Sequence, residues 1–185
     1  MDAVAIIVIV IVALVAIAVG AVVGFGYAKK DRSRELKQRF GPEYDRTVRT
    51  KGRREAEVEL GQREARVESL QIRALGAEER RVFLNQWEAV QIEFVDQPES
   101  AIGKADSLVQ EVMQSRGYPV GDFEQRSADI SVDHPEVVDS YRQAHSIAVA
   151  HEREAVSTEQ LRQAMLHYRT LFDELLGEVA ARRNS

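Results

Sequence analysis

The N-terminal part of the chain contains an unbroken apolar stretch. Residues 4–28 carry no charge and no proline, and the Tyr27 hydroxyl is the only polar side-chain group among these 25 residues. As an α-helix the stretch would measure about 37 Å, which is enough to cross a hydrocarbon core of about 30 Å with some tilt. A surface helix of a soluble domain would show a polar face over this length. The pattern therefore predicts one transmembrane helix over residues 4–28.

A charged region follows this stretch and predicts further helices. Residues 29–40 form a charged helical extension, which Gly41 and Pro42 end. Residues 52–75 then show a long polar helix pattern, whose apolar positions follow an approximate heptad spacing at Leu60, Val67, Leu70 and Ala74. Two heptads are too few to establish a coiled coil. The pattern indicates a stalk-like helix that either packs loosely or pairs with a copy of itself.

Four apolar stripes at helical spacing occupy the remainder of the chain. The first two begin after Gly76 and after Pro98. The third has residues 131–135 as its cap and first turn, and the fourth begins at Ser157, which forms a capping box with Gln160. A short helix is also predicted over residues 122–130, and no alternating strand pattern is present. The stripes are Phe83, Trp87, Val90 and Phe94; Ile102, Ala105, Leu108, Val109 and Val112; Val138, Tyr141, Ala144, His145 and Ala148; and Leu161, Ala164, Met165, Tyr168, Leu171, Phe172, Leu175 and Leu176.

These stripes predict an all-α fold. None of the helices can bury its stripe alone, so four helices with short connections indicate a small antiparallel bundle. We expect three regions: a transmembrane helix over 4–28, a basic juxtamembrane and stalk-like helical segment over 29–75, and a helical bundle domain over 76–185.

The charge of the chain is divided between two zones. Residues 29–54 contain 11 basic and four acidic side chains, a net charge of +7, whereas residues 55–185 carry a net charge of −11. Lys and Arg follow the apolar stretch but do not precede it. Because these residues concentrate on the cytoplasmic flank of a span, we expect the N-terminus outside the cell and the C-terminal domain in the cytoplasm. Export of the domain is the alternative.

Two sets of residues are candidate contact sites. Basic residues next to the span are expected to bind the membrane surface and its anionic lipids, namely Lys29, Lys30, Arg32, Arg34, Lys37 and Arg39. Within the span, Ala16, Gly20 and Gly24 recur every fourth residue, a spacing that lets two membrane helices pack closely as a homodimer. Nucleic acid is not an expected partner, because the basic segment contains no recognisable nucleic-acid-binding motif.

The sequence contains no complete catalytic, metal-binding or phosphate-binding motif. Cysteine is absent from the sequence, which excludes disulfides, thiolate catalysis and Cys-based metal sites. No pair of the four histidines has a metal-binding spacing. Ser131, Asp133 and His134 are triad residue types, but their closeness in sequence fits a helix cap. Lys104 follows a glycine as in a phosphate-binding loop, yet Ala105 replaces the required Ser or Thr. We expect no catalytic, cofactor-binding or metal-binding residue and no enzyme activity.

Five segments of the chain carry a resemblance to a known family: residues 39–45 (RFGPEYD), 87–96 (WEAVQIEFVD), 116–119 (RGYP), 131–135 (SVDHP) and 161–169 (LRQAMLHYR). With these segments the chain resembles, over nearly its whole length, a bacterial family of uncharacterised single-pass membrane proteins, often labelled "secreted". The resemblance implies a bacterial envelope location and the one-span layout. It implies no activity.

Three functions are compatible with this layout. The first is a membrane-anchored interaction or scaffold module, whose bundle contacts a protein partner or a second copy of the chain. The second is an envelope enzyme or small-ligand-binding domain with a site among His145, His167, Tyr141, Tyr168 and Arg116. The third is a stress-related envelope protein with an exported domain. The lack of a catalytic pattern favours the first, and a cavity that joins the five side chains would favour the second.

Overall fold

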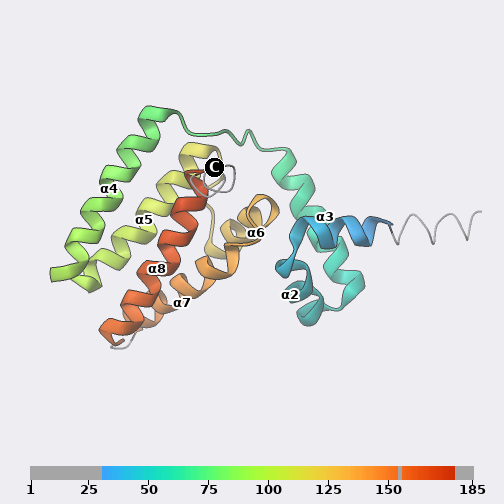
Figure 1. Cartoon of the computed structure of the whole chain (residues 1–185). Coiled ribbons are helices and arrows are strands. Elements are labelled where there is room, and N and C mark those ends of the chain that lie inside the picture. Colours follow the sequence, from blue (N-terminus) through green and yellow to red (C-terminus); the bar gives the residue numbers. More distant parts are fainter. Residues whose placement is uncertain (1–30, 154–155, 178–185) are drawn as a thin grey trace, which may run out of the picture. The chain divides into compact units, whose positions relative to one another are not determined.

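The computed structural model describes residues 31–153 and 156–177, and every regular element in these ranges is an α-helix. Residues 31–40 are helical. They are followed by α2 (Pro42–Lys51), α3 (Arg53–Glu68), α4 (Ala77–Asp96), α5 (Pro98–Arg116), α6 (Phe123–Asp133), α7 (Val138–Arg153) and α8 (Thr158–Leu175), shown in Figure 1. The all-α prediction is confirmed for these residues.

The predicted transmembrane helix over residues 4–28 lies outside the described residues. None of the helices inside them is long and apolar enough to cross a membrane. The chain forms two compact units, Met1–Arg39 and Phe40–Ser185, and α2 to α8 all belong to the second.

Helices α4, α5, α7 and α8 form a bundle (Figure 1). Helix α4 packs on α5, α5 packs on α8, and α8 packs on α7. The pairs α4–α5 and α7–α8 are antiparallel, because each pair is joined by a short connection. Gln97 alone separates α4 from α5, and Pro98 occupies the first turn of α5, where a missing backbone N–H costs nothing. The predicted helical bundle is confirmed.

The predicted stripes form most of the core of this bundle. Every stripe residue of α5 and α8 is buried, and so are three of the four in α4. Trp87 of α4 stacks on Phe172 of α8 with 4.6 Å between ring centroids. In α7 the stripe is less complete, because His145 and Ala148 are only half-buried. Burial of these apolar surfaces is the main force that holds the four helices together.

The helix predicted over residues 52–75 is shorter in the structure. Helix α3 ends at Glu68, and residues 71–76 have no regular secondary structure. This segment is held in place by the bundle: the Arg73 amide donates to the Arg116 carbonyl at 2.8 Å, and Ile72 and Leu75 pack against the core. Tertiary contacts with the end of α5 therefore replace the last two turns of the predicted helix.

The segment predicted to begin the third bundle helix, residues 131–135, instead ends α6. Ser131 and Asp133 lie in the last turn of α6, and α7 starts only at Val138. The Ser131 hydroxyl donates to the Ala128 carbonyl of its own helix at 2.7 Å. Pro135 disfavours the helical conformation of the residue before it, so α6 stops at this point.

Glycine is required at position 117, where the end of α5 contacts residues 71 and 72. Its φ of 100° lies in the left-handed region, and a Cβ atom here would lie 2.5 Å from the Gln71 carbonyl oxygen. Both the backbone conformation and the close approach exclude a side chain.

We expect Gly117→Ala to lower the free energy of unfolding by about 2 kcal/mol or more, because the left-handed conformation alone costs about 1–2 kcal/mol for a residue with a Cβ atom. The measurement is urea denaturation followed by fluorescence of Trp87, the only tryptophan. Gly103→Ala in α5 is the matched control, because a Cβ there meets nothing within 4 Å. We expect this substitution to raise the free energy of unfolding by about 0.5–1 kcal/mol. Equal effects of the two substitutions would contradict this role of Gly117.

Candidate functional site

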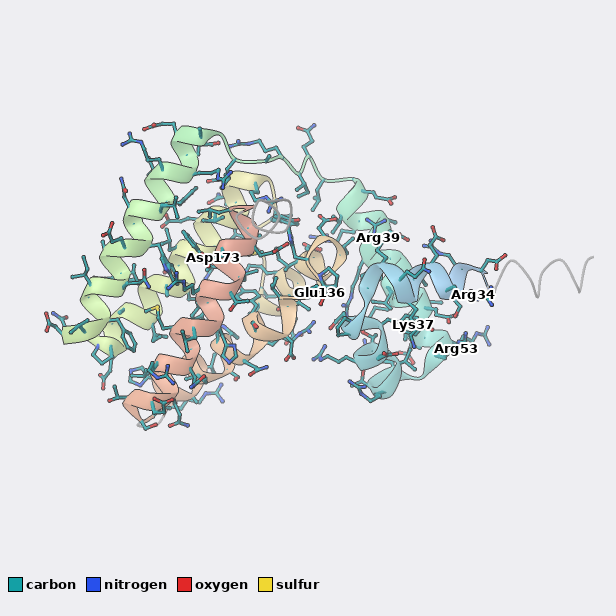
Figure 2. The ribbon with its side chains drawn as sticks, in the orientation of Figure 1. Arg34, Lys37, Arg39, Arg53, Glu136 and Asp173 are labelled. Carbon is teal, nitrogen blue, oxygen red and sulfur yellow. The ribbon has the colours of Figure 1, made fainter. Side chains whose placement is uncertain are left out.

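The described part of the predicted membrane-surface site lies on the helix over residues 31–40. Arg32, Arg34 and Lys37 are exposed, and Figure 2 labels the latter two together with Arg39. Arg32 pairs with Glu35 at 2.9 Å on the surface of this helix. The remaining predicted site residues, Lys29, Lys30, Ala16, Gly20 and Gly24, lie outside the described residues.

A buried carboxylate, which sequence reasoning did not single out, attaches α2 and α3 to the bundle. The Glu43 side chain of α2 is only 1% exposed. Arg142 of α7 donates two hydrogen bonds to its two carboxylate oxygens, each at 2.8 Å. Arg63 of α3 donates a third, also at 2.8 Å, to Oε1. A planar guanidinium that binds both oxygens of a carboxylate is among the strongest ion-pair geometries in proteins.

The two arginines control the protonation of Glu43. Burial alone would raise the pKa of this carboxyl, but the hydrogen bonds from Arg142 and Arg63 and their positive charges outweigh it, so the pKa lies below its ordinary value of 4.5. Glu43 is therefore charged at neutral pH. Removal of this charge would leave the half-buried Arg142 without a carboxylate partner among the described residues, and Arg63 with Glu59 alone.

A second ion pair joins α3 to α6. Arg66 donates from Nε to the Asp129 carboxylate at 2.9 Å, and the Asp129 side chain is fully buried. Gln125 donates to the same carboxylate oxygen at 2.8 Å. We refer to Glu43, Arg63, Arg142, Arg66 and Asp129 as the clasp. It joins the α2–α3 hairpin to α6 and α7.

The clasp combines positions that are far apart in the sequence. Glu43 and Arg142 are separated by 99 residues, and Arg66 and Asp129 by 63. The only hint of the clasp in the local sequence is Glu43, a carboxylate within a strongly basic segment.

The five side chains of the ligand-binding hypothesis lie in different surroundings. The Tyr141 and Tyr168 rings meet edge to face with centroids 6.5 Å apart, and His145 stacks on Phe123 at 3.6 Å. A surface hollow of about 630 Å³ lies beside His145. None of the other four side chains lines that hollow, whose lining residues are Asp122, Phe123, Glu124, Arg142, His145, Ser146 and Val149.

The two tyrosines are buried phenols rather than acid–base groups at neutral pH. Burial raises the pKa of Tyr141 to about 12, although Arg126, which donates to its hydroxyl at 3.0 Å, opposes the shift. Burial and the nearby Asp106 carboxylate raise the pKa of Tyr168 further. Both hydroxyls therefore stay protonated across the physiological range.

Arg116 takes part in a different cluster, at the C-terminal ends of α5 and α8. Its guanidinium donates to the Leu175 carbonyl at 3.0 Å and lies 3.2 Å from His134 Nε2. The other ring nitrogen of His134 lies 3.1 Å from Glu174 Oε1. Burial, with a contribution from the Arg116 charge, lowers the pKa of His134 despite the opposing effect of Glu174.

No three His, Asp or Glu side chains converge as metal ligands within the described ranges. The absence of a metal site from the whole chain stays a prediction. Lys104, which resembled the end of a phosphate-binding loop, lies in the middle of α5 and pairs with Glu93 at 2.6 Å.

No family model, curated protein or solved structure matches the chain.

We expect Glu43→Gln to release the α2–α3 hairpin from the bundle. Loss of one partner of a buried ion pair costs about 3–5 kcal/mol. Amide hydrogen exchange should therefore accelerate roughly a hundredfold or more in α2 and α3 but not in α4 and α5. Glu159→Gln, which removes a carboxylate from an exposed pair with Arg162, is the control and should leave exchange unchanged. Unaltered protection of α2 and α3 in Glu43→Gln would show that the clasp does not hold the hairpin.

Acid should weaken the wild-type clasp in the same way. Because the folded-state pKa of Glu43 is lowered, its contribution to stability is complete above pH 4.5 and is lost as the pH falls below that value. Exchange of the α2 and α3 amides, corrected for the intrinsic pH dependence, should show this loss in the wild type. The same loss should be absent from Glu43→Gln.

His134 should produce a separate acid-dependent loss at higher pH. Its folded-state pKa lies below the ordinary 6.5, so its contribution is complete above pH 6.5 and declines as the pH falls toward the lowered value. We expect the midpoint of urea denaturation to fall across this range in the wild type and to fall less in His134→Gln. Identical pH profiles of the two proteins would exclude His134 as the titrating group.

Proposed function

We propose that this chain is a bacterial membrane-anchored interaction module, with the N-terminus outside the cell and the helical bundle in the cytoplasm. The observation that carries the proposal is the succession of an uncharged 25-residue stretch, a basic segment and a well-packed helical unit. A single span over residues 4–28 would hold the bundle near the bilayer, and the Lys and Arg that follow it would fix its orientation. Ala16, Gly20 and Gly24 would allow two spans to pair.

The separation of charge supports attachment through the basic zone, residues 29–54. The basic residues between Lys29 and Arg54 are attracted to anionic lipids, including those at Lys29, Lys30, Arg32, Arg34, Lys37 and Arg39. The acidic remainder of the chain is repelled by the same lipids. A surface of the bundle thus stays available to a protein partner.

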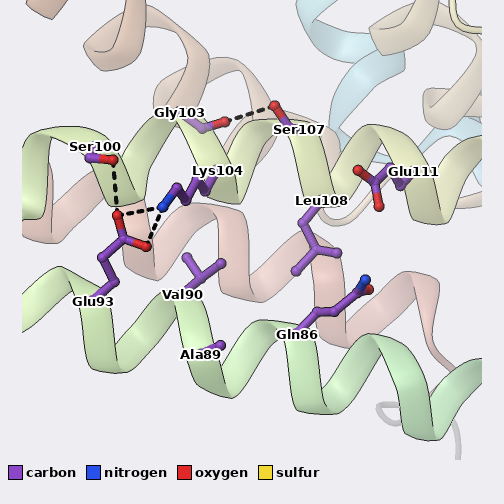
Figure 3. Close-up of a pocket in the computed structure, with 10 residues that line it drawn as sticks. All are labelled: Gln86, Ala89, Val90, Glu93, Ser100, Gly103, Lys104, Ser107, Leu108 and Glu111. Atoms are coloured by element: carbon purple, nitrogen blue, oxygen red, sulfur yellow. Dashed lines mark hydrogen bonds and ion pairs between the residues drawn. The ribbon is translucent and has the colours of Figure 1, made fainter.

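The outer side of α4 and α5 indicates which kind of protein surface could bind there. Ile92 and Val95 of α4 are 65% and 81% exposed. Separately, a hollow of about 500 Å³ lies between α4 and α5 and is crossed by the Glu93–Lys104 ion pair (Figure 3). Its lining is Gln86, Ala89, Val90, Glu93, Ser100, Gly103, Lys104, Ser107, Leu108 and Glu111. Because residues 55–185 carry a net charge of −11, the complementary partner surface is apolar at its centre and basic at its rim.

The anchor and its orientation are tested together in bacterial cells. We expect the full chain with a C-terminal tag to stay in the membrane fraction after alkaline carbonate washing. The tag should resist protease in intact spheroplasts and be digested once the membrane is permeabilised. Because the sequence contains no cysteine, a single Cys near the N-terminus, in place of Asp2, can be labelled from outside as a matched check of orientation.

Release of the chain by carbonate would contradict the anchor. Digestion of the tag in intact spheroplasts would reverse the orientation and favour an exported domain. A variant with Val12→Glu and Ala16→Glu should lose membrane retention, since each charge at the centre of a span costs about 2.5–3.5 kcal/mol.

A further inference from the structure

The turn between α2 and α3 presents a compact group of positive charges. All residues from Arg49 to Glu55 are exposed. Four of these seven are basic, and Glu55 is the single acid. On the next turn of α3 the apolar side chain of Val58 is 57% exposed. We refer to residues 49–55 and Val58 as the hairpin tip.

The backbone of the tip brings these charges close together. Gly52, with a φ of 78°, ends α2 and begins α3 without any other intervening residue. A hollow of about 510 Å³ lies at this turn, lined by Lys51, Gly52, Arg53, Arg54, Glu55 and Val58. A left-handed glycine is what allows two helices to meet in so short a turn.

Much of this positive charge is not used by the fold. Lys51 pairs with Glu59, and Arg53 pairs with Glu57 at 2.9 Å. Arg49 and Arg54 have no carboxylate partner among the described residues. Figure 2 labels Arg53, whose side chain is 67% exposed even with its pair formed. The tip therefore offers at least two guanidinium groups to an external anion.

The tip lies within reach of the membrane surface. Only 22 residues lie between Ala28 and Lys51. Residues 31–40 and α2 are two ten-residue helices, each about 15 Å long. Even if they were placed end to end, the tip would lie within about 40 Å of the end of the apolar stretch, and any bend between them shortens this distance.

We propose that the hairpin tip is a second membrane contact that binds the anionic headgroups of the inner leaflet. This contact rests on the anchor proposed above, which brings the tip close to lipid. Guanidinium groups bind the phosphate and carboxylate oxygens of such headgroups in pairs of hydrogen bonds. Val58 adds an apolar side chain at the level of the lipid interface. Each basic residue near an anionic surface strengthens binding roughly fivefold.

A second contact would fix the orientation of the bundle. The clasp holds the hairpin to α6 and α7 through Glu43, Arg142 and the Arg66–Asp129 pair. A tip held against lipid would therefore limit rotation of the whole unit about its connection to the span. The outer side of α4 and α5 would then have a constant direction relative to the bilayer.

The test uses the full chain in lipid nanodiscs. The sequence has no cysteine, so Thr50→Cys places a single spin label in the exposed tip without background. We expect collisions of this label with an aqueous nickel relaxant to fall severalfold in discs of phosphatidylcholine with phosphatidylserine, relative to phosphatidylcholine alone. A label at Leu166→Cys, on an exposed position of α8, should show no such difference.

Matched charge variants separate the tip from general electrostatics. Arg49→Glu, Arg53→Glu and Arg54→Glu together should abolish the protection at Thr50→Cys. The control triple, with Arg81, Arg162 and Arg169 each replaced by Glu, makes the same change in net charge at exposed positions elsewhere and should keep it. The neutral triple Arg49→Gln, Arg53→Gln and Arg54→Gln should lose most of the protection, and amide exchange in α2 and α3 confirms that the hairpin stays folded.

Three results would overturn the tip contact. The protection of the Thr50→Cys label could be independent of phosphatidylserine, or it could be lost equally in the control triple. Single-stranded RNA could also remove the protection by binding the tip more tightly than lipid does. Each of these is observed with the chain retained in the discs. Failure of the chain to remain in the discs would instead contradict the membrane anchor.

Discussion

The arrangement of this molecule depends on one buried carboxylate. Glu43 is held by Arg142 across two hydrogen bonds and by Arg63 through a third. A charge withdrawn from water is stable only when such partners satisfy it, and removal of Glu43 would leave Arg142 without a carboxylate partner among the described residues. The ion pair therefore makes the position of the α2–α3 hairpin on the bundle highly specific. Apolar contact alone would tolerate more sliding between the two parts.

This attachment connects the two zones of charge to the proposed function. The basic hairpin tip is the part of the second unit that anionic lipid would attract, and the acidic bundle is the part that lipid would repel. If they were flexibly joined, the bundle would rotate freely beneath the membrane. Joined by the clasp, they would transmit a membrane contact at the hairpin tip to the exposed side of α4 and α5. The function that we propose is therefore presentation of a surface at a defined distance and direction from the bilayer.

Much of the fold could be predicted from local patterns, because the bundle helices bury stripes that recur at helical spacing. Phe83, Trp87 and Val90 are an example of such a stripe. The predictions failed where distant contacts decide the local structure. Residues 71–75 have a helical pattern but form no helix, because the Arg73 amide donates to the Arg116 carbonyl and the segment packs against the core. The clasp could not be predicted at all, since no local pattern pairs Glu43 with Arg142. The site residues inside the span remain predictions.

The role of Glu43 is tested most directly by the distance between two spin labels, at Thr50→Cys in the hairpin and at Val95→Cys on α4. The distance is measured by pulsed electron paramagnetic resonance, with the full chain in anionic nanodiscs. Both positions are exposed and lie within one compact unit. The account predicts a single narrow distance distribution, which broadens when Glu43 is replaced by Gln. A broad distribution in the wild-type background, or one that Glu43→Gln leaves unchanged, would contradict the claim that Glu43 joins the hairpin and the bundle into one body.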